Sequence, residues 1–174
     1  MSAVAEPAFS KRSIVALIVL LVTCFAASAI GGALTRPNLD WYATLVKPGF
    51  TPPNSVFPFA WMFLYVTVAI AAWLVWLTPG KEEDKTLAFI WLGILLVTAV
   101  LWPAAFFWLH SPALGFGVIV VFLVTIAITI VMFSRLSRVA ALLMVPLLLW
   151  VSFAMGLNFV IWALNSGYDF SQPS

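Results

Sequence analysis

Residues 113–133 read ALGFGVIVVFLVTIAITIVMF and contain no charged side chain. An α-helix needs about 20 predominantly apolar residues to cross the hydrocarbon core of a bilayer. A backbone that faces lipid has to satisfy its own hydrogen bonds, which a helix does and an open strand does not. This stretch therefore predicts a membrane-spanning helix and decides the fold class of the chain.

Four further apolar stretches have the same character, at residues 14–34, 56–77, 87–109 and 139–164. None has Asp, Glu, Lys or Arg in its interior. Only 8% of the 174 residues are charged, too few to give a soluble domain of this size a solvated surface. The sequence predicts an all-α integral membrane protein: a five-transmembrane-helix bundle that forms a single domain over residues 1–174.

The first apolar stretch also fits a second interpretation. Lys11 and Arg12 precede it, and the triplet Ala27-Ser28-Ala29 resembles a signal-peptidase site. The apolar run continues beyond this triplet to Leu34, which is long enough to span a membrane. We therefore expect a retained helix, with a cleaved signal peptide as the alternative.

The positions of Lys and Arg predict the orientation in the membrane. The N-terminal side collects six of them (Lys11, Arg12, Lys81, Lys85, Arg135 and Arg138), and the other side only Arg36 and Lys47. Loops rich in Lys and Arg stay in the cytoplasm. The sequence thus predicts a bacterial inner membrane protein with its N-terminus cytoplasmic and its C-terminus outside.

The lack of intramembrane charge excludes several functions. Proton relays, voltage sensors and ion pathways place ionisable groups inside the bundle, and none occurs in these spans. No metal-ligand spacing or nucleophile–base pair is visible. Cys24 is expected to be a small buried hydrophobe and His110 an interfacial residue. The net charge of +2 is too small to indicate a nucleic acid partner.

Three ordered motifs carry a family resemblance. They are WYATLVKPGFTPPNSVFPFAWMFLY at residues 41–65, LWPAAFF at 101–107 and LLLWVSFAMGLNFVIWALN at 147–165. Together they resemble the TspO/translocator protein family, the tryptophan-rich sensory proteins related to the peripheral-type benzodiazepine receptor. The resemblance implies a homodimeric bundle whose cavity, covered by the first loop, binds tetrapyrroles such as protoporphyrin or haem. A porphyrin is expected as ligand or substrate, and no separate cofactor is expected.

The candidate site residues lie at helical spacing on three spans. Trp61 and Tyr65 share one helix face, and Trp102 and Phe106 share another. The last span has a stripe of Trp150, Phe153, Ala154, Leu157, Asn158 and Ile161. Spacing alone fits helix packing as well as a ligand slot. The resemblance favours the ligand site, because Trp61, Trp150 and Ala154 match cavity positions of the family.

The first loop is the remaining candidate element. Pro48, Pro52 and Pro53 restrict its conformations, and its aromatic residues, among them Tyr42, favour a covered surface. We expect a lid over the bundle mouth that contributes Tyr42, Pro52 and Pro53 to the site. Anchoring of the loop in the membrane interface is the alternative. Arg36 and Lys47 are candidates for pairing with ligand carboxylates.

Three departures from the family pattern bear on the ligand. Ala99 stands where an Asn is common, and Gly49-Phe50 stands where the lid often has a Trp. Phe159 replaces the tyrosine of the sterol-recognition pattern, which makes a sterol partner doubtful. Pro103 is expected to disturb the third span locally, because proline removes one backbone donor.

The function predicted first is a membrane receptor or regulator that binds a tetrapyrrole. One alternative is an enzyme that degrades porphyrin with light and oxygen, in which Trp61 and Trp150 are the catalytic, redox-active groups. Another is a transporter of porphyrin or of small apolar ligands, although inverted repeats are lacking.

Overall fold

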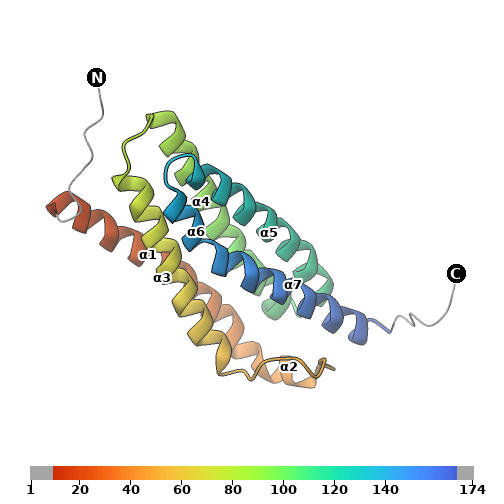
Figure 1. Ribbon diagram of the computed structural model, residues 1–174. Coiled ribbons are helices and arrows are strands. Elements are labelled where there is room, and N and C mark those ends of the chain that lie inside the picture. The colour runs from red at the N-terminus through yellow and green to blue at the C-terminus, as the bar shows by residue number, and fades with distance from the viewer. Residues whose placement is uncertain (1–9, 168–174) are drawn as a thin grey trace, which may run out of the picture.

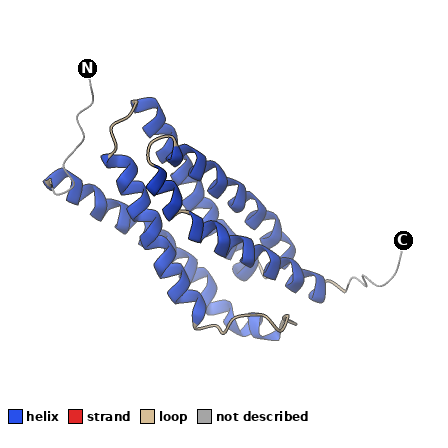
Figure 2. Cartoon of the chain, viewed as in Figure 1, coloured by secondary structure: helices blue, strands red, loops and turns tan. Residues whose placement is uncertain are grey.

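The computed structural model describes residues 10–167, and every regular element in that part of the chain is helical (Figures 1 and 2). Five helical segments are long and apolar enough to cross a membrane, which confirms the predicted fold class. The helices are α1 (Lys11–Thr35), η1 (Arg36–Asn38), α2 (Leu39–Thr44), α3 (Val56–Leu77), α4 (Glu82–Pro103), η2 (Ala104–Trp108), α5 (Pro112–Ser134), α6 (Arg138–Leu143) and α7 (Val145–Asn165).

Serine side chains cap three of these helices. Ser10, Ser111 and Ser137 accept hydrogen bonds from backbone N–H groups in the first turns of α1, α5 and α6, at 3.1, 3.2 and 3.3 Å. Each bond satisfies a donor that the helix itself leaves unpaired. Pro112 follows its cap at the start of α5, where a missing N–H costs nothing. The serine caps therefore define where these three helices begin.

The structure corrects the boundaries of two spans. The third span was predicted over residues 87–109, but its helix α4 already begins at Glu82. The acidic side chains of Glu82, Glu83 and Asp84 lie in its first turn, where they interact favourably with the helix dipole. The last span is two helices, because α6 ends at Leu143 and α7 begins two residues later with Pro146 near its start.

The third span changes its helix type at the predicted place. The α-helical part of this span ends at Pro103, and residues Ala104–Trp108 form a π-helical turn. The N–H of Leu109 donates to the carbonyl of Ala104 at 2.9 Å and closes that turn. The wider turn directs Phe106 and Phe107 inward, where both are buried.

The helices form a ring in which one contact is weak. Helix α1 packs against α3 and α4, α5 packs against α4 and α7, and α6 packs against α3 and α5. Helices α3 and α7 make few contacts, and they diverge toward the first loop in Figure 1. A buried pair of hydroxyls, Thr98 and Thr125, joins α4 to α5 at 3.1 Å. The space between the diverging helices holds the candidate site.

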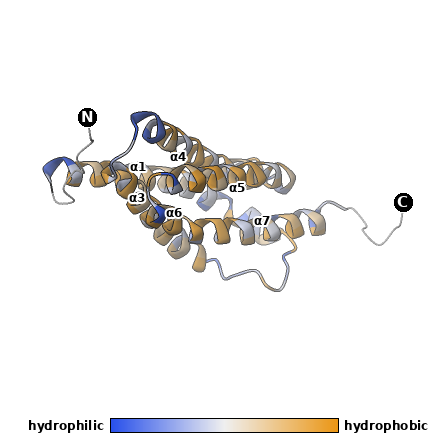
Figure 3. Cartoon of the chain, turned by 45° about the horizontal axis from the view of Figure 1, so that its top comes forward, coloured by the Kyte–Doolittle hydropathy of each residue, from blue (hydrophilic) through white to orange (hydrophobic). Residues whose placement is uncertain are grey.

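Hydrophobic residues cover the length of the bundle, and the hydrophilic ones gather at helix ends (Figure 3). The start of α1, the start of α4 and the start of α6 lie at one end of the bundle (Figure 1). The opposite end carries η1, α2 and the first loop. The segments that the sequence assigned to the two sides of the membrane are thus segregated.

Candidate functional site

A central cavity of about 420 Å³ opens at the end of the bundle that carries the first loop. Its volume lies within the range of small-molecule sites. Its aromatic wall consists of Phe25, Tyr42, Phe57, Trp61, Tyr65, Trp102, Phe106 and Phe107. Small side chains or glycines line other parts of it, namely Ser28, Gly31, Gly32, Thr35, Ala99 and Ala154. Large flat rings beside small residues leave room for a planar apolar ligand.

Trp61 is the centre of the aromatic wall. Its ring lies 5.7 Å from that of Tyr65 and 6.4 Å from that of Trp102, tilted by 34° in both cases. Phe122 of α5 stacks behind it at 6.5 Å and 12°. Because neighbours from three helices hold this indole, its face toward the cavity is fixed before any ligand binds.

Asn158 fixes the second indole of the wall. Its Oδ1 accepts a hydrogen bond from the Trp102 indole at 3.1 Å, and its Nδ2 donates to the Pro112 carbonyl at 2.7 Å. The Asn158 side chain is only 2% exposed, so these bonds link α4, α5 and α7 in a dry setting. The predicted ligand residue Asn158 therefore also positions Trp102.

The predicted stripe on α7 is divided between two hollows. Ala154, Leu157, Asn158 and Ile161 line the central cavity, whereas Trp150 and Phe153 line an open groove between α3 and α7. At about 100° per residue, the neighbours Phe153 and Ala154 point in directions about 100° apart. Since α7 leaves α3 at this level, one side of the stripe faces the cavity and the other faces the groove.

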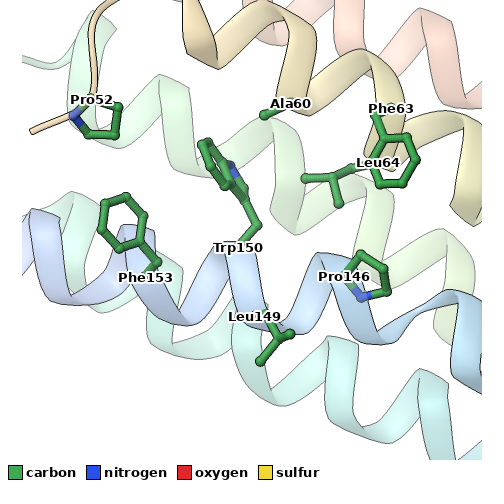
Figure 4. A pocket seen from close by; sticks show the side chains of 8 residues that line it. All are labelled: Pro52, Ala60, Phe63, Leu64, Pro146, Leu149, Trp150 and Phe153. Atoms are coloured by element: carbon green, nitrogen blue, oxygen red, sulfur yellow. The ribbon is translucent and has the colours of Figure 1, made fainter.

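The groove has a volume of about 470 Å³ and an apolar lining (Figure 4). In Figure 4 the Trp150 side chain extends from α7 toward α3, between Phe153 and Leu64. Its ring meets Phe57, which lines the central cavity, at 5.9 Å, so this pair separates the two hollows. The buried Trp150 Nε1 has no hydrogen-bond acceptor among the described residues.

The twelve predicted ligand residues are thus placed in three groups. Eight line the central cavity: Tyr42, Trp61, Tyr65, Trp102, Phe106, Ala154, Leu157 and Asn158. Pro52, Trp150 and Phe153 line the groove. Pro53 lines neither hollow.

Helix α1 contributes cavity residues that the sequence analysis did not assign to the site. Ser28, Gly31, Gly32 and Thr35 lie at helical spacing and face the cavity. Their signal was the run of small residues near the end of the first span, which also fits close helix packing. Because this pattern does not distinguish a cavity lining from a packing face, these four residues were not assigned to the site.

The first loop is attached to the bundle at two points. The backbone N–H of Val46 donates to Asn165 Oδ1, and Asn165 Nδ2 donates to the Val46 carbonyl, both at 2.9 Å. At the other end of α2, His110 Nε2 lies 2.8 Å from Asn38 Oδ1, and its ring stacks on Trp41 at 4.5 Å. Because Asn38 Nδ2 already donates to the Leu34 carbonyl, the histidine nitrogen is the donor.

The two cations of this end have different environments. The Lys47 ammonium donates to the carbonyls of Tyr42, Ala43 and Leu45 at 2.7, 3.3 and 2.7 Å, which satisfies the C-terminal end of α2. Arg36 lines the central cavity, and its guanidinium has no hydrogen-bond or ion-pair partner within residues 10–167. Of the two candidates for a ligand carboxylate, only Arg36 has a charged group without a partner among the described residues.

Residues 17–163 match the sequence model of the TspO/MBR family. The chain belongs to the TspO/MBR family. It is 36% identical to the tryptophan-rich protein TspO of Chlorobaculum tepidum, over 89% of this chain and 99% of the relative. It is 35% identical to protein CrtK of Rhodobacter capsulatus, over 89% and 96%, and 33% identical to the human translocator protein, over 83% and 85%.

Membership of the TspO/MBR family confirms the resemblance inferred from the three motifs. It agrees with the five spans of the structure and with an integral membrane protein. The family match covers the helices that build the central cavity, from α1 to nearly the end of α7.

Proposed function

We propose that this protein is a membrane receptor or regulator that binds porphyrin-type tetrapyrroles in its central cavity. The observation that carries the proposal is the preformed wall of Trp61 and Trp102 opposite small residues of α1 and α7. A flat aromatic macrocycle gains apolar burial and ring stacking in such a slot. A relative in Cereibacter sphaeroides, 35% identical, is named a tryptophan-rich sensory protein, which agrees with a receptor.

The test is a titration of the detergent-purified protein with protoporphyrin in the dark, followed by the absorbance of the porphyrin and by tryptophan fluorescence. We expect saturable binding that Trp61→Phe weakens about tenfold, since the indole loses ring contact worth roughly 1 kcal/mol or more. Trp150→Phe is the matched variant, because Trp150 lines the groove instead. A larger loss from Trp150→Phe would place the ligand in the groove, and no saturable binding would refute the receptor.

A light-dependent porphyrin-degrading enzyme is the second candidate. Trp61, Tyr65 and Trp102 form a cluster of oxidisable rings at the cavity wall, which suits chemistry that needs no acid–base pair. Illumination of the same titrated samples tests it. New absorbance bands that depend on Trp61 support the enzyme, and identical spectra in the dark and in the light remove it.

The membrane orientation and the assembly belong to the proposal as well. Six Lys and Arg residues lie at the end of the bundle where α1 begins, which favours a cytoplasmic N-terminus in a bacterial inner membrane. A homodimer and the binding of haem are supported by the family resemblance alone.

A further inference from the structure

We propose that Arg36 is the recognition site for a ligand carboxylate, so that the cavity selects planar apolar acids and holds their acidic edge at its mouth. This inference rests on the proposed function and specifies its substrate class. Arg36 is the one charged side chain among the described residues that line the central cavity. It is exposed, which places it where the cavity meets water.

In the part of the chain that the structure describes, the guanidinium has no competing partner. Asp40 lies four residues away in the first turn of α2, yet neither it nor another carboxylate within residues 10–167 pairs with Arg36. The neighbouring cation Lys47 is held by three carbonyl oxygens and by the Tyr42 ring, 4.8 Å from its ammonium. A guanidinium offers two parallel N–H donors that match the two oxygens of a carboxylate.

A second donor lies in the same part of the cavity. Tyr42 is 5% exposed, lines the cavity, and its hydroxyl has no hydrogen bond with any described residue. The hydroxyl oxygen itself is not enclosed by protein, so it is accessible and can donate to a ligand oxygen. Arg36 and Tyr42 both belong to the short segment between α1 and the first loop, so one acidic group in this region has two donors of different kinds.

The arrangement fixes the direction of binding. Transfer of a carboxylate into the aromatic interior is strongly unfavourable, whereas an apolar ring system gains free energy there. A ligand with an apolar face and an acidic edge therefore enters ring first and leaves its carboxylates beside Arg36. A neutral ligand of the same shape lacks this anchor.

The experiment compares protoporphyrin, which carries two carboxylates, with its dimethyl ester, in dark titrations of the same detergent-purified protein. We expect Arg36→Gln to weaken binding of the acid about threefold to tenfold, the modest range of an exposed pair, and to leave the ester unchanged. Arg36→Lys should restore part of the difference. Arg135→Gln is the matched control, because Arg135 is an exposed arginine at the opposite end of the bundle.

The possible outcomes separate this inference from the proposed function. Equal affinity of acid and ester for the native protein, or an equal loss of both in Arg36→Gln, overturns the carboxylate site and leaves porphyrin binding intact. If neither compound binds the native protein saturably, the receptor proposal itself fails. A gap between acid and ester that narrows as salt is raised supports the charge pairing, because exposed pairs are screened.

Discussion

At the scale of single residues, Gly115 shows how closely the bundle packs behind the cavity. A Cβ atom added there would lie 2.9 Å from Phe106 Cβ and 3.0 Å from Asn158 Oδ1. The first contact is with an atom next to the Phe106 backbone, which cannot move alone. The second is with the acceptor that holds Trp102 in place. The missing side chain at this position therefore supports the indole wall indirectly.

We predict that Gly115→Ala destabilises the protein by about 1–3 kcal/mol, the usual range for an overpacked core. Thermal unfolding in detergent would show it as a lower apparent Tm, by about 2–4 °C for each kcal/mol. Porphyrin affinity should fall too, because Asn158 and Trp102 shift. Gly117→Ala is the control on the same helix, since nothing lies within 4 Å of a Cβ there. Equal effects of the two substitutions would contradict the packing argument.

At the scale of elements, the attachment of the first loop to the bundle depends on Asn165 at the end of α7. Two hydrogen bonds join its amide to the backbone of Val46, and both are exposed to solvent. Exposed bonds of this kind contribute about 0.5–1.5 kcal/mol each. Loss of both bonds would therefore weaken the attachment of the loop far more than it would weaken the bundle.

We predict that Asn165→Ala opens the loop without unfolding the bundle. Hydrogen exchange of residues 45–50 should become about tenfold faster or more, and bound porphyrin should dissociate faster. Thr44→Ala is the control, because the Thr44 hydroxyl bonds only to the Trp41 carbonyl within α2. Unchanged exchange in Asn165→Ala would mean that contacts elsewhere, such as the stacked pair of Trp41 and His110, hold the loop.

The elements also show what a sequence pattern can and cannot predict. The five spans could be predicted from uninterrupted apolar runs, because a helix needs a minimum apolar length to cross the bilayer. The helical start of α4 was missed because the span was predicted from its apolar residues alone, although acidic residues such as Glu82 and Glu83 suit a first helical turn. The division of the α7 stripe depends on where α3 leaves α7, which no periodicity within α7 records.

At the scale of the whole molecule, the ring of helices is incomplete between α3 and α7. The cavity lies in this part of the bundle, and residues of separate spans line it together. The motifs located eight of the twelve predicted ligand residues at the cavity. They did not reveal that α1 supplies small residues to the cavity, or that the Arg36 guanidinium pairs with none of the described residues while Lys47 caps α2. Those facts depend on contacts between segments that are distant in the sequence. Composition and residue spacing carry no information about such contacts.

The unequal distribution of Lys and Arg between the two ends of the bundle leads to the last prediction. The proposed membrane orientation has α2 and the cavity mouth outside the cytoplasm, and the α5–α6 connection inside it. Ala43→Cys on α2 and Ser134→Cys at the end of α5 both replace exposed residues. The native Cys24 is only 1% exposed and should stay unlabelled. An impermeant maleimide applied to intact bacterial spheroplasts should label Ala43→Cys, and should label Ser134→Cys only after the membrane is permeabilised. The reverse pattern would place the cavity mouth beside Arg36 in the cytoplasm, so that the ligand would have to enter from the cytoplasm.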